Sequence, residues 1–199
     1  MTSIHAAAED KPAKPDPKVD KLEEQLAFKS RFVLVFGEIT DAMALATCRR
    51  LLALSEESEA PITMLISSPG GHVESGDAIF DLIRFVRAPV TTVGSGWVAS
   101  AGAHIFLAPP KERRLCLPNT RFMIHQPAGG AGGQATDIAI QAREIVRTRE
   151  RLARVIARET GQPLERVTID MERDFWMSAD DAIAYGIASR VIERQKDLA

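Results

Sequence analysis

Only two of the 199 residues are cysteines, and this scarcity excludes several kinds of protein. Cys48 and Cys116 cannot form the disulfide framework of a small secreted protein. They also lack the paired spacing of a zinc site, so we expect no metal site. Two unpaired cysteines fit a reducing compartment, and we therefore expect a cytoplasmic protein.

Long apolar runs and an excess of basic charge are also missing. No segment approaches the roughly 18 apolar residues that a membrane span needs, so we expect no membrane partner. The segment "MTSIHAAAEDKPAKPDPKVDKLEE" lacks the apolar stretch of a signal peptide. The net charge is −2 and no basic stripe is visible, which makes nucleic acid an unexpected partner.

The hydrophobic content of 45% is enough to bury one sizeable core, and the length favours a single domain. The N-terminal segment mixes charges of both signs and contains Pro12, Pro15 and Pro17. We therefore expect a disordered or extended tail over residues 1–21, a folded domain over 22–193 and a short C-terminal tail over 194–199.

Apolar runs alternate with amphipathic stretches in the rest of the chain. Three strands are expected, followed in turn by three helices with an apolar stripe. The strands fall within 31–37, 61–71 and 88–96, and the helices within 40–55, 72–86 and 100–108. Because parallel neighbours need a crossover connection, these units predict an α/β fold with a mostly parallel sheet.

The second half of the sequence predicts two short strands and two helices. The strands lie within 113–118 and 121–127, before a glycine-rich loop. One long helix is expected over 136–160, with Gly161 as its C-cap. In "SADDAIAYG", Ser178 and Asp181 have the spacing of a capping box at the start of a last helix.

Ser100 lies where the third strand meets its helix, in "TTVGSGWVASAGAHIFLAPP". Ligand crevices form at the carboxyl ends of parallel strands, and a helix N-terminus offers free N–H groups. The N–H of Ala101 is therefore a candidate donor to an oxyanion. Serine is equally an ordinary helix N-cap, so the local sequence alone leaves both interpretations open.

A second glycine-rich turn, "SSPGG", follows the preceding strand. Pro69 fixes the backbone, while Gly70 and Gly71 can bring an amide close to a ligand. A structural turn would use the same residues. Two such turns after successive parallel strands converge on one crevice, however, and this favours a functional site.

A serine nucleophile needs a base and an acid that orients the base. His125 ends a strand beside the glycine-rich loop and can face a cleft, although a lone histidine there is more often a core residue. Several acids lie between residues 170 and 181. Asp174, next to Phe175 and Trp176, is the one that we expect to be partly buried.

Five segments resemble, in order and spacing, the proteolytic subunit of the Clp protease, ClpP. They are "SSPGG", "GWVASAGA", "RFMIHQPAGG", "GQATDIAIQAREI" and "MERDFWMSADDAIAYGI", and the resemblance runs from about residue 32 to 192. It implies a serine endopeptidase with Ser100 as nucleophile, His125 as general base and Asp174 as orienting acid. The oxyanion amides would be those of Gly71 and Ala101.

The resemblance also implies a crotonase-like fold with a long handle helix, and two stacked heptameric rings that form a tetradecamer around a chamber. The substrates would be unfolded polypeptides, delivered by an AAA+ unfoldase of the ClpX or ClpA type, and a second ClpP paralogue could share the rings. The chain has no Walker A motif, so no cofactor is expected in this subunit and the partner would use the ATP. Candidate cleft residues are Gly70, Trp97, Gln126 and Pro127, and candidate ring–ring contacts are Gln134, Asp137 and Arg173.

Some positions depart from the family. The N-terminal tail differs from the family's pore-lining segment, and Thr63 and Leu65 replace aromatics that are frequent in the ATPase-docking pocket. Trp97 and Ala101 replace a usual glutamine and a usual methionine.

Two alternatives remain: a non-catalytic ring subunit, and an acyl-CoA hydratase or isomerase on the same fold. A dinucleotide site at Gly94 and Gly96 is a poorer choice, because the third glycine is misplaced.

Overall fold

The computed structural model describes residues 17–130 and 132–198. Seven strands form one sheet whose main path runs β1-β2-β3-β4-β7, while β5 pairs with β3 and β6 pairs with β5. All pairs are parallel except β5 with β6. The strands are β1 (Phe32–Phe36), β2 (Ile62–Ser68), β3 (Val90–Ala99), β4 (Arg114–Cys116), β5 (Arg121–Ile124), β6 (Phe175–Met177) and β7 (Arg190–Val191).

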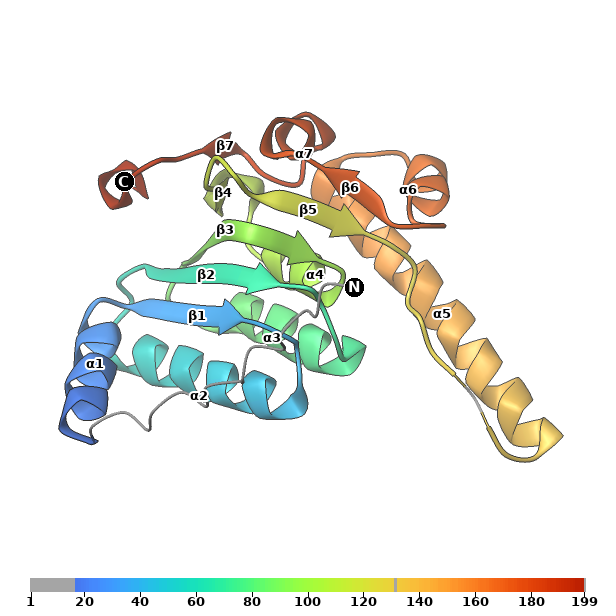
Figure 1. The fold of residues 1–199 in the computed structure, drawn as a ribbon, viewed down its shortest axis with the longest axis horizontal. Coiled ribbons are helices and arrows are strands. Elements are labelled where there is room, and N and C mark those ends of the chain that lie inside the picture. Colours follow the sequence, from blue (N-terminus) through green and yellow to red (C-terminus); the bar gives the residue numbers. More distant parts are fainter. Residues whose placement is uncertain (1–16, 131, 199) are drawn as a thin grey trace, which may run out of the picture.

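Helices connect the parallel strands and pack on the sheet. In Figure 1, α2, α3 and α4 lie along one side of the sheet, and α5 extends away from it. The helices are α1 (Pro17–Lys29), α2 (Asp41–Glu57), α3 (Val73–Phe85), α4 (Ala101–Phe106), α5 (Ala135–Thr160), α6 (Leu164–Asp170) and α7 (Ala179–Tyr185), with 3-10 turns η1 (Lys111–Arg113) and η2 (Gln195–Leu198). The α/β fold predicted from the sequence, with its three successive strand–helix units, is confirmed.

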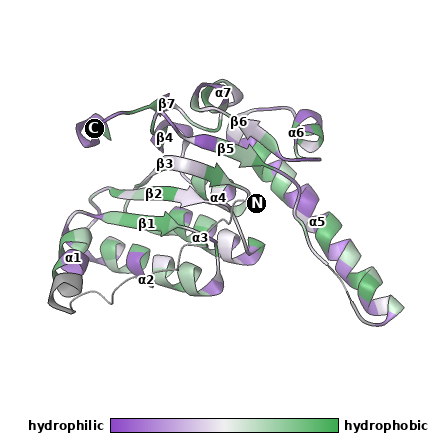
Figure 2. Cartoon of the chain, in the orientation of Figure 1, coloured by the Kyte–Doolittle hydropathy of each residue, from purple (hydrophilic) through white to green (hydrophobic). Residues whose placement is uncertain are grey.

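The main core fills the space between the sheet and its helices. Its central side chains come from alternate positions of β1 and β2 and from the inner faces of the helices. They include Val33, Val35, Met64, Ile66, Leu51, Leu54, Ile79 and Ile105, all essentially inaccessible to solvent. Figure 2 shows hydrophobic residues along β1 and β2, whereas α5 mixes hydrophobic and hydrophilic residues along its length.

Helix α5 belongs to the core only in its second half. Leu152, Ala153, Ile156 and Thr160 are buried, whereas the side chains before Leu152 are exposed or half-buried. The segment that follows β5 runs outward along the projecting half of α5 (Figure 1). The core end of α5 is fixed by buried Arg114, which donates hydrogen bonds to the Glu159 carbonyl and carboxylate, each at 2.7 Å. The long helix predicted for 136–160 is thus confirmed to within one residue.

The boundaries of the tails need correction. Helix α1 begins at Pro17, so a helix starts inside the segment 1–21 that we expected to be disordered or extended; residues 1–16 lie outside the described residues. The segment after residue 193 contains η2, and its Leu198 packs against a small second core of Val93, Leu115 and Ile192.

The C-terminal end of α5 and the N-terminal end of α7 have the caps that the sequence predicts. Ser178 caps α7 in a reciprocal capping box with Asp181, and Gly161 ends α5 in the left-handed conformation. In the described part of the chain, no helix is both long and apolar enough to cross a bilayer.

Candidate active site

Strand register brings three polar side chains to one edge of the sheet. Ser100 is the first residue after the β3 segment that pairs with β5, and Ala99 lies opposite Met123. His125 is the first residue after β5, and Asp174 is the last residue before β6, whose Phe175 pairs with Ile124. Each of the three therefore stands one position beyond a paired strand, and the sheet itself makes them neighbours.

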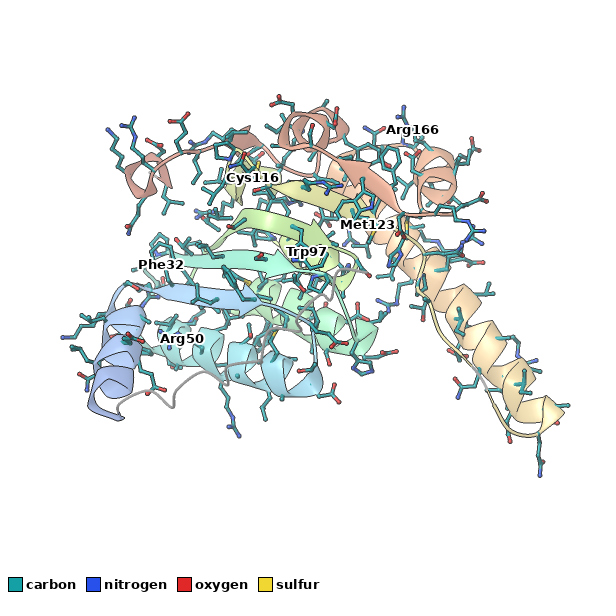
Figure 3. The ribbon with its side chains drawn as sticks, viewed as in Figure 1. Phe32, Arg50, Trp97, Cys116, Met123 and Arg166 are labelled. Carbon is teal, nitrogen blue, oxygen red and sulfur yellow. The ribbon has the colours of Figure 1, made fainter. Side chains whose placement is uncertain are left out.

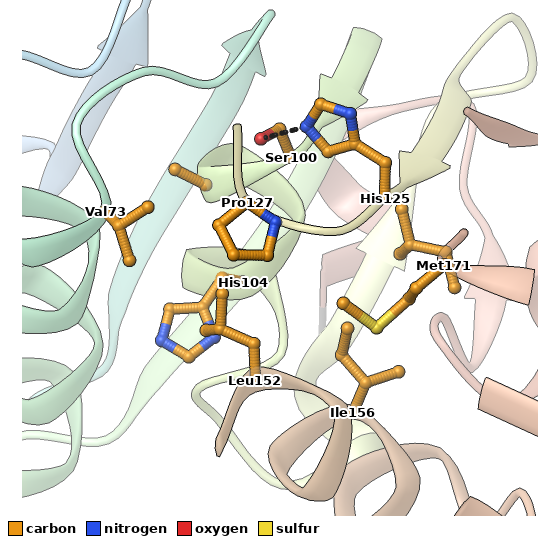
Figure 4. Close-up of a pocket in the computed structure, with 10 residues that line it drawn as sticks. Val73, Ser100, His104, His125, Pro127, Leu152, Ile156 and Met171 are labelled. Atoms are coloured by element: carbon orange, nitrogen blue, oxygen red, sulfur yellow. Dashed lines mark hydrogen bonds between the residues drawn. The ribbon is translucent and has the colours of Figure 1, made fainter. Parts of the chain in front are cut away.

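The three side chains form a continuous hydrogen-bonded chain. His125 Nε2 lies 2.8 Å from Ser100 Oγ, and His125 Nδ1 lies 3.0 Å from Asp174 Oδ1. Figure 4 shows the first of these contacts at the top of the cleft. A carboxylate can only accept hydrogen bonds, so the neutral imidazole carries its proton on Nδ1 and offers the lone pair of Nε2 to the serine hydroxyl. This arrangement can take a proton from Ser100.

Ser100 has an unusual backbone conformation. Its φ of 55° and ψ of −121° lie outside the usual regions for a residue with a side chain, which is a strain found mainly at functional sites. The N–H of Ser100 donates to the Met123 carbonyl at 2.9 Å and holds the strained turn against β5. An ordinary helix N-cap adopts extended backbone and bonds its side chain to the helix, and Ser100 does neither.

The turn after β2 requires glycine at two positions. A Cβ at Gly70 would lie 2.5 Å from Ser100 Cβ, and Gly71, with a φ of +148°, packs against the Ile39 backbone with no room for a Cβ. The amide groups of Gly71 and Ala101 have no hydrogen-bond acceptor among the described residues, so both are free to donate to a ligand. Two such donors beside a serine hydroxyl have the components that an oxyanion hole needs.

Asp174 is more exposed than its sequence context indicates. We expected the neighbouring Phe175 and Trp176 to bury it in part, but 61% of its side chain is accessible in this chain. Trp176 is itself 38% exposed, because β6 is an edge strand that is covered on one side only by β5. That part of the expectation was wrong, although the carboxylate does reach His125.

A narrow cleft opens directly below Ser100 and His125 (Figure 4). Its cavity volume is only about 30 Å³, room for about one water molecule, and its walls come from α3, α4, β5, α5 and the end of α6. Almost all of the lining is apolar. Apart from Ser100 and His125, it consists of Val73, Ala101, His104, Ile124, Pro127, Leu152, Ile156 and Met171.

The other residues singled out in the sequence are distributed around this site. Pro127 lines the cleft, while Gly70 lies against Ser100. Gln126 does not line it; its side-chain amide donates to the Glu172 carbonyl at 2.9 Å and ties the end of β5 to the segment before β6. Trp97 lies on β3 (Figure 3), is 46% exposed and is not part of the lining.

The three candidate ring–ring residues are exposed. Gln134 precedes the first turn of α5 and Asp137 lies within that turn, at the projecting end of the helix. Arg173 directly precedes Asp174. The structure thus places one of them beside the hydrogen-bonded chain and two at the far end of α5 (Figure 1).

Sequence reasoning missed one residue of the cleft, His104. It lies one helical turn after Ser100, but only the structure shows that its ring is buried in the cleft wall beside Asp77 of α3.

Among the described residues, no group of three or more His, Cys, Asp or Glu side chains is placed to hold a metal ion. Gly94, from the possible dinucleotide motif, serves packing, since a Cβ there would lie 2.9 Å from Thr120 Cγ2.

Comparisons with known proteins agree on one family. The family model described as "Clp protease" matches residues 17–195. A protein of Rhizobium johnstonii named ATP-dependent Clp protease proteolytic subunit 3 is 52% identical over 178 residues, which cover 89% of this chain and 92% of that protein. Proteolytic subunit 2 of Gluconobacter oxydans is 51% identical, over 96% of this chain and 91% of its own length.

Solved structures give the same result. ClpP1 from Listeria monocytogenes superimposes with a TM-score of 0.81 and 47% identity, over 89% of this chain and 99% of that one. A mutant of the same protein superimposes with a TM-score of 0.84.

Proposed function

The chain belongs to the Clp protease family and is a serine-type endopeptidase, and we propose that Ser100, His125 and Asp174 are its catalytic triad. The observation that carries the proposal is the chain of contacts at 2.8 Å and 3.0 Å that joins the three side chains. The strained backbone of Ser100 is a second support, because it presents the hydroxyl to the cleft instead of to the helix.

Peptide cleavage would proceed in two steps. His125 Nε2 takes the hydroxyl proton as Ser100 Oγ bonds to the carbonyl carbon, and the amides of Gly71 and Ala101 hold the resulting oxyanion. The imidazolium, stabilised by Asp174, then gives its proton to the departing amine as the C–N bond breaks. Water repeats the sequence on the acyl-enzyme and releases the new carboxyl terminus with Ser100 regenerated.

The cleft begins at the serine, where the side chain that precedes the scissile bond would lie. Its apolar walls would desolvate such a side chain, but they have to move apart to admit one larger than a water molecule. Ile124 ends β5, and His125 and Pro127 follow it directly, so the same segment would position base and substrate. Burial of the substrate next to the nucleophile contributes to orientation as well as to affinity.

The assembly proposed for the chain follows the family. We expect heptameric rings stacked in pairs around a chamber, with unfolded polypeptide fed by an AAA+ unfoldase that uses the ATP; this subunit needs no cofactor. The projecting half of α5 supports such a contact, because Ile138, Ile140 and Val146 on it are exposed apolar residues that a partner could cover. Gln134, Asp137 and Arg173 are the polar residues that we expect at the contact between rings.

Other functions find less support. The relatives are named proteolytic subunits, and a hydratase or isomerase of the crotonase type would use carboxylates as acid and base where this site has a serine and a histidine. A ring subunit without activity would have no need of the aligned contacts around His125.

Replacement of the nucleophile tests the proposal. The Ser100→Ala variant should lose hydrolysis of a fluorogenic peptide by at least about a thousandfold, because the triad acts as a unit. Ser95→Ala, on the same strand, is the matched control and should retain activity. Light scattering should show the same assembly for all three proteins. Undiminished turnover by a Ser100→Ala protein purified free of other peptidases would remove Ser100 from the mechanism.

A further inference from the structure

The face of the sheet opposite the helices carries both tryptophans of the chain beside an exposed arginine. Trp97 of β3 lies opposite Arg121 of β5, and Trp176 of β6 lies opposite Met123 of β5. The β5 residues that alternate with Arg121 and Met123 belong to the main core under the helices, so these two point to the other face. Figure 3 marks Trp97 and Met123 on their strands. We call Trp97, Arg121 and Trp176 the aromatic patch.

The guanidinium group of Arg121 is oriented by the patch and still has donors to offer. Its central carbon lies over the Trp176 ring, 4.4 Å from the ring centre. A guanidinium that contacts a ring through its face leaves the N–H groups of its plane available to other partners. In the described part of the chain, no group forms a hydrogen bond or an ion pair with this side chain. Arg121 is therefore a positioned cation whose partner comes from outside the chain.

The aromatic patch adjoins the proposed catalytic triad. Arg121 lies four residues before His125 on one extended segment, and Trp176 lies two residues after Asp174. At about 3.3 Å per residue, the Cα atoms of Arg121 and His125 are about 13 Å apart. A substrate that reaches the triad can reach the patch as well.

The chemistry of cleavage decides which part of a substrate passes the patch. His125 gives its proton to the departing amine, so the residues that follow the scissile bond lie on the His125 side of the site. The narrow cleft below Ser100 opens on the helix side of the sheet instead. The patch on β5 and β6 is thus placed to contact the departing part of the polypeptide.

The chemical character of the patch favours a carboxylate. The fork of N–H groups on a guanidinium matches the two oxygens of a carboxylate, and such pairs are stronger than neutral hydrogen bonds. The nearest acid on these strands is Asp174, which already accepts from His125. The tryptophans, both partly exposed, offer apolar surface to the methylene groups that carry the carboxylate.

We propose that Arg121, held over Trp176, determines specificity by binding the carboxylate of an aspartate or glutamate in the part of the polypeptide that follows the scissile bond. The proposal rests on the proposed function, since it takes Ser100 and His125 as the residues that cleave. An extended peptide advances about 3.4 Å per residue, so a distance of about 13 Å places the acidic side chain at about the fourth residue after the bond.

The test moves one charge along a substrate. Internally quenched peptides with amidated C-termini carry a single Glu at the second to the sixth residue after the cleaved bond, which mass spectrometry verifies. Each has a partner peptide with Gln at the same position, and the measured quantity is the ratio of kcat/KM for Glu over Gln. The two side chains have nearly the same shape, so the ratio reports the charge. It is measured in wild type, in Arg121→Gln and in Arg190→Gln, a matched control that removes an exposed arginine from β7.

We expect the wild-type ratio to be about three- to tenfold with Glu at the third to fifth residue and near one at the other positions, the size of an exposed bidentate ion pair. The preference should disappear in Arg121→Gln and persist in Arg190→Gln. It should also shrink as salt is added, because exposed charges are screened.

Other results would count against the proposal. A ratio near one at every position in wild type, or a preference that survives in Arg121→Gln, would overturn it and leave the proposed function standing. If Arg121→Gln does not assemble, Arg121→Lys keeps the charge without the fork and should still lower the ratio; an unchanged ratio would overturn the proposal equally. Preference only for a peptide that ends at the same position in a free carboxylate would assign Arg121 to a chain terminus, against the side-chain proposal. A wild-type protein that cleaves none of the peptides, and whose Ser100 reacts with no fluorophosphonate, would overturn both proposals.

Discussion

Gly70 packs against the proposed nucleophile with no room for a side chain. A Cβ at this position would lie 2.5 Å from Ser100 Cβ and 2.9 Å from Ser100 Oγ, where ordinary contact begins at 3.4 Å. The backbone φ of +100° adds strain for any residue with a Cβ. The Gly70→Ala substitution therefore has to separate the turn after β2 from Ser100 by about 0.9 Å.

A displacement of this size is large for the catalytic geometry. Ser100 Oγ and His125 Nε2 are 2.8 Å apart, so a shift of nearly 1 Å takes the pair beyond a normal hydrogen bond. Movement of the turn instead would carry the Gly71 amide away from the oxyanion. Because misplacement by about 1 Å lowers rates by about 100-fold, we expect kcat/KM to fall by about that factor.

The assay is hydrolysis of a fluorogenic peptide, with the rate of fluorophosphonate labelling as a second readout. Gly161→Ala is the matched control, because Gly161 also has a positive φ, of +77°, but a Cβ there would meet nothing within 4 Å. It should lose some stability and keep its specific activity. Wild-type activity in a folded Gly70→Ala protein would refute the geometric argument.

Three further results are expected. Asp174→Asn should leave the fold intact and lower kcat by about 10²- to 10⁴-fold, because the amide can donate to Nδ1 of His125, which favours the wrong tautomer, and cannot stabilise the imidazolium by charge. Pre-steady-state kinetics with a peptide ester measures this, and normal rates would mean that another acid serves. Burial raises the pKa of Asp77, but contacts with His104 and Arg151 outweigh it. Asp77 therefore has a pKa below its unfolded value, so its contribution to stability, at most about 2 kcal/mol, is present above about pH 4 and is lost as the pH falls toward 2. In urea titrations, the free energies of unfolding of wild type and Asp77→Asn should converge over that range. A constant difference between the two would contradict the lowered pKa of Asp77. Gly186→Ala should destabilise the protein by about 3 kcal/mol in the same titrations, since its Cβ would lie 2.2 Å from the Thr160 carbonyl oxygen, and a neutral result would show that this contact relaxes easily.

The parts of the fold that were predictable are those with a strong local pattern. The strand at 32–36, the long amphipathic helix and the capping box at Ser178 each follow from residues close together in the sequence. Strands β6 and β7 have only three and two residues, and their partners β5 and β4 determine them. Such elements exist through tertiary pairing, so no periodicity predicts them.

The site divides in the same way. Ser100 and its glycine turns were recognisable because they follow successive parallel strands, and His125 because it ends a strand. The exposure of Asp174 depends on how β6 sits at the sheet edge. The place of His104 in the cleft depends on α3, α4 and α5 together, which lie far apart in sequence.

Reaction with a fluorophosphonate tests the central claim most directly, since the reagent modifies only a serine that a base has activated. Intact mass and peptide mapping should show one adduct, on Ser100, in the wild-type protein and none in His125→Ala. No adduct on Ser100, or one that persists without His125, would contradict the assignment of these two residues as nucleophile and base.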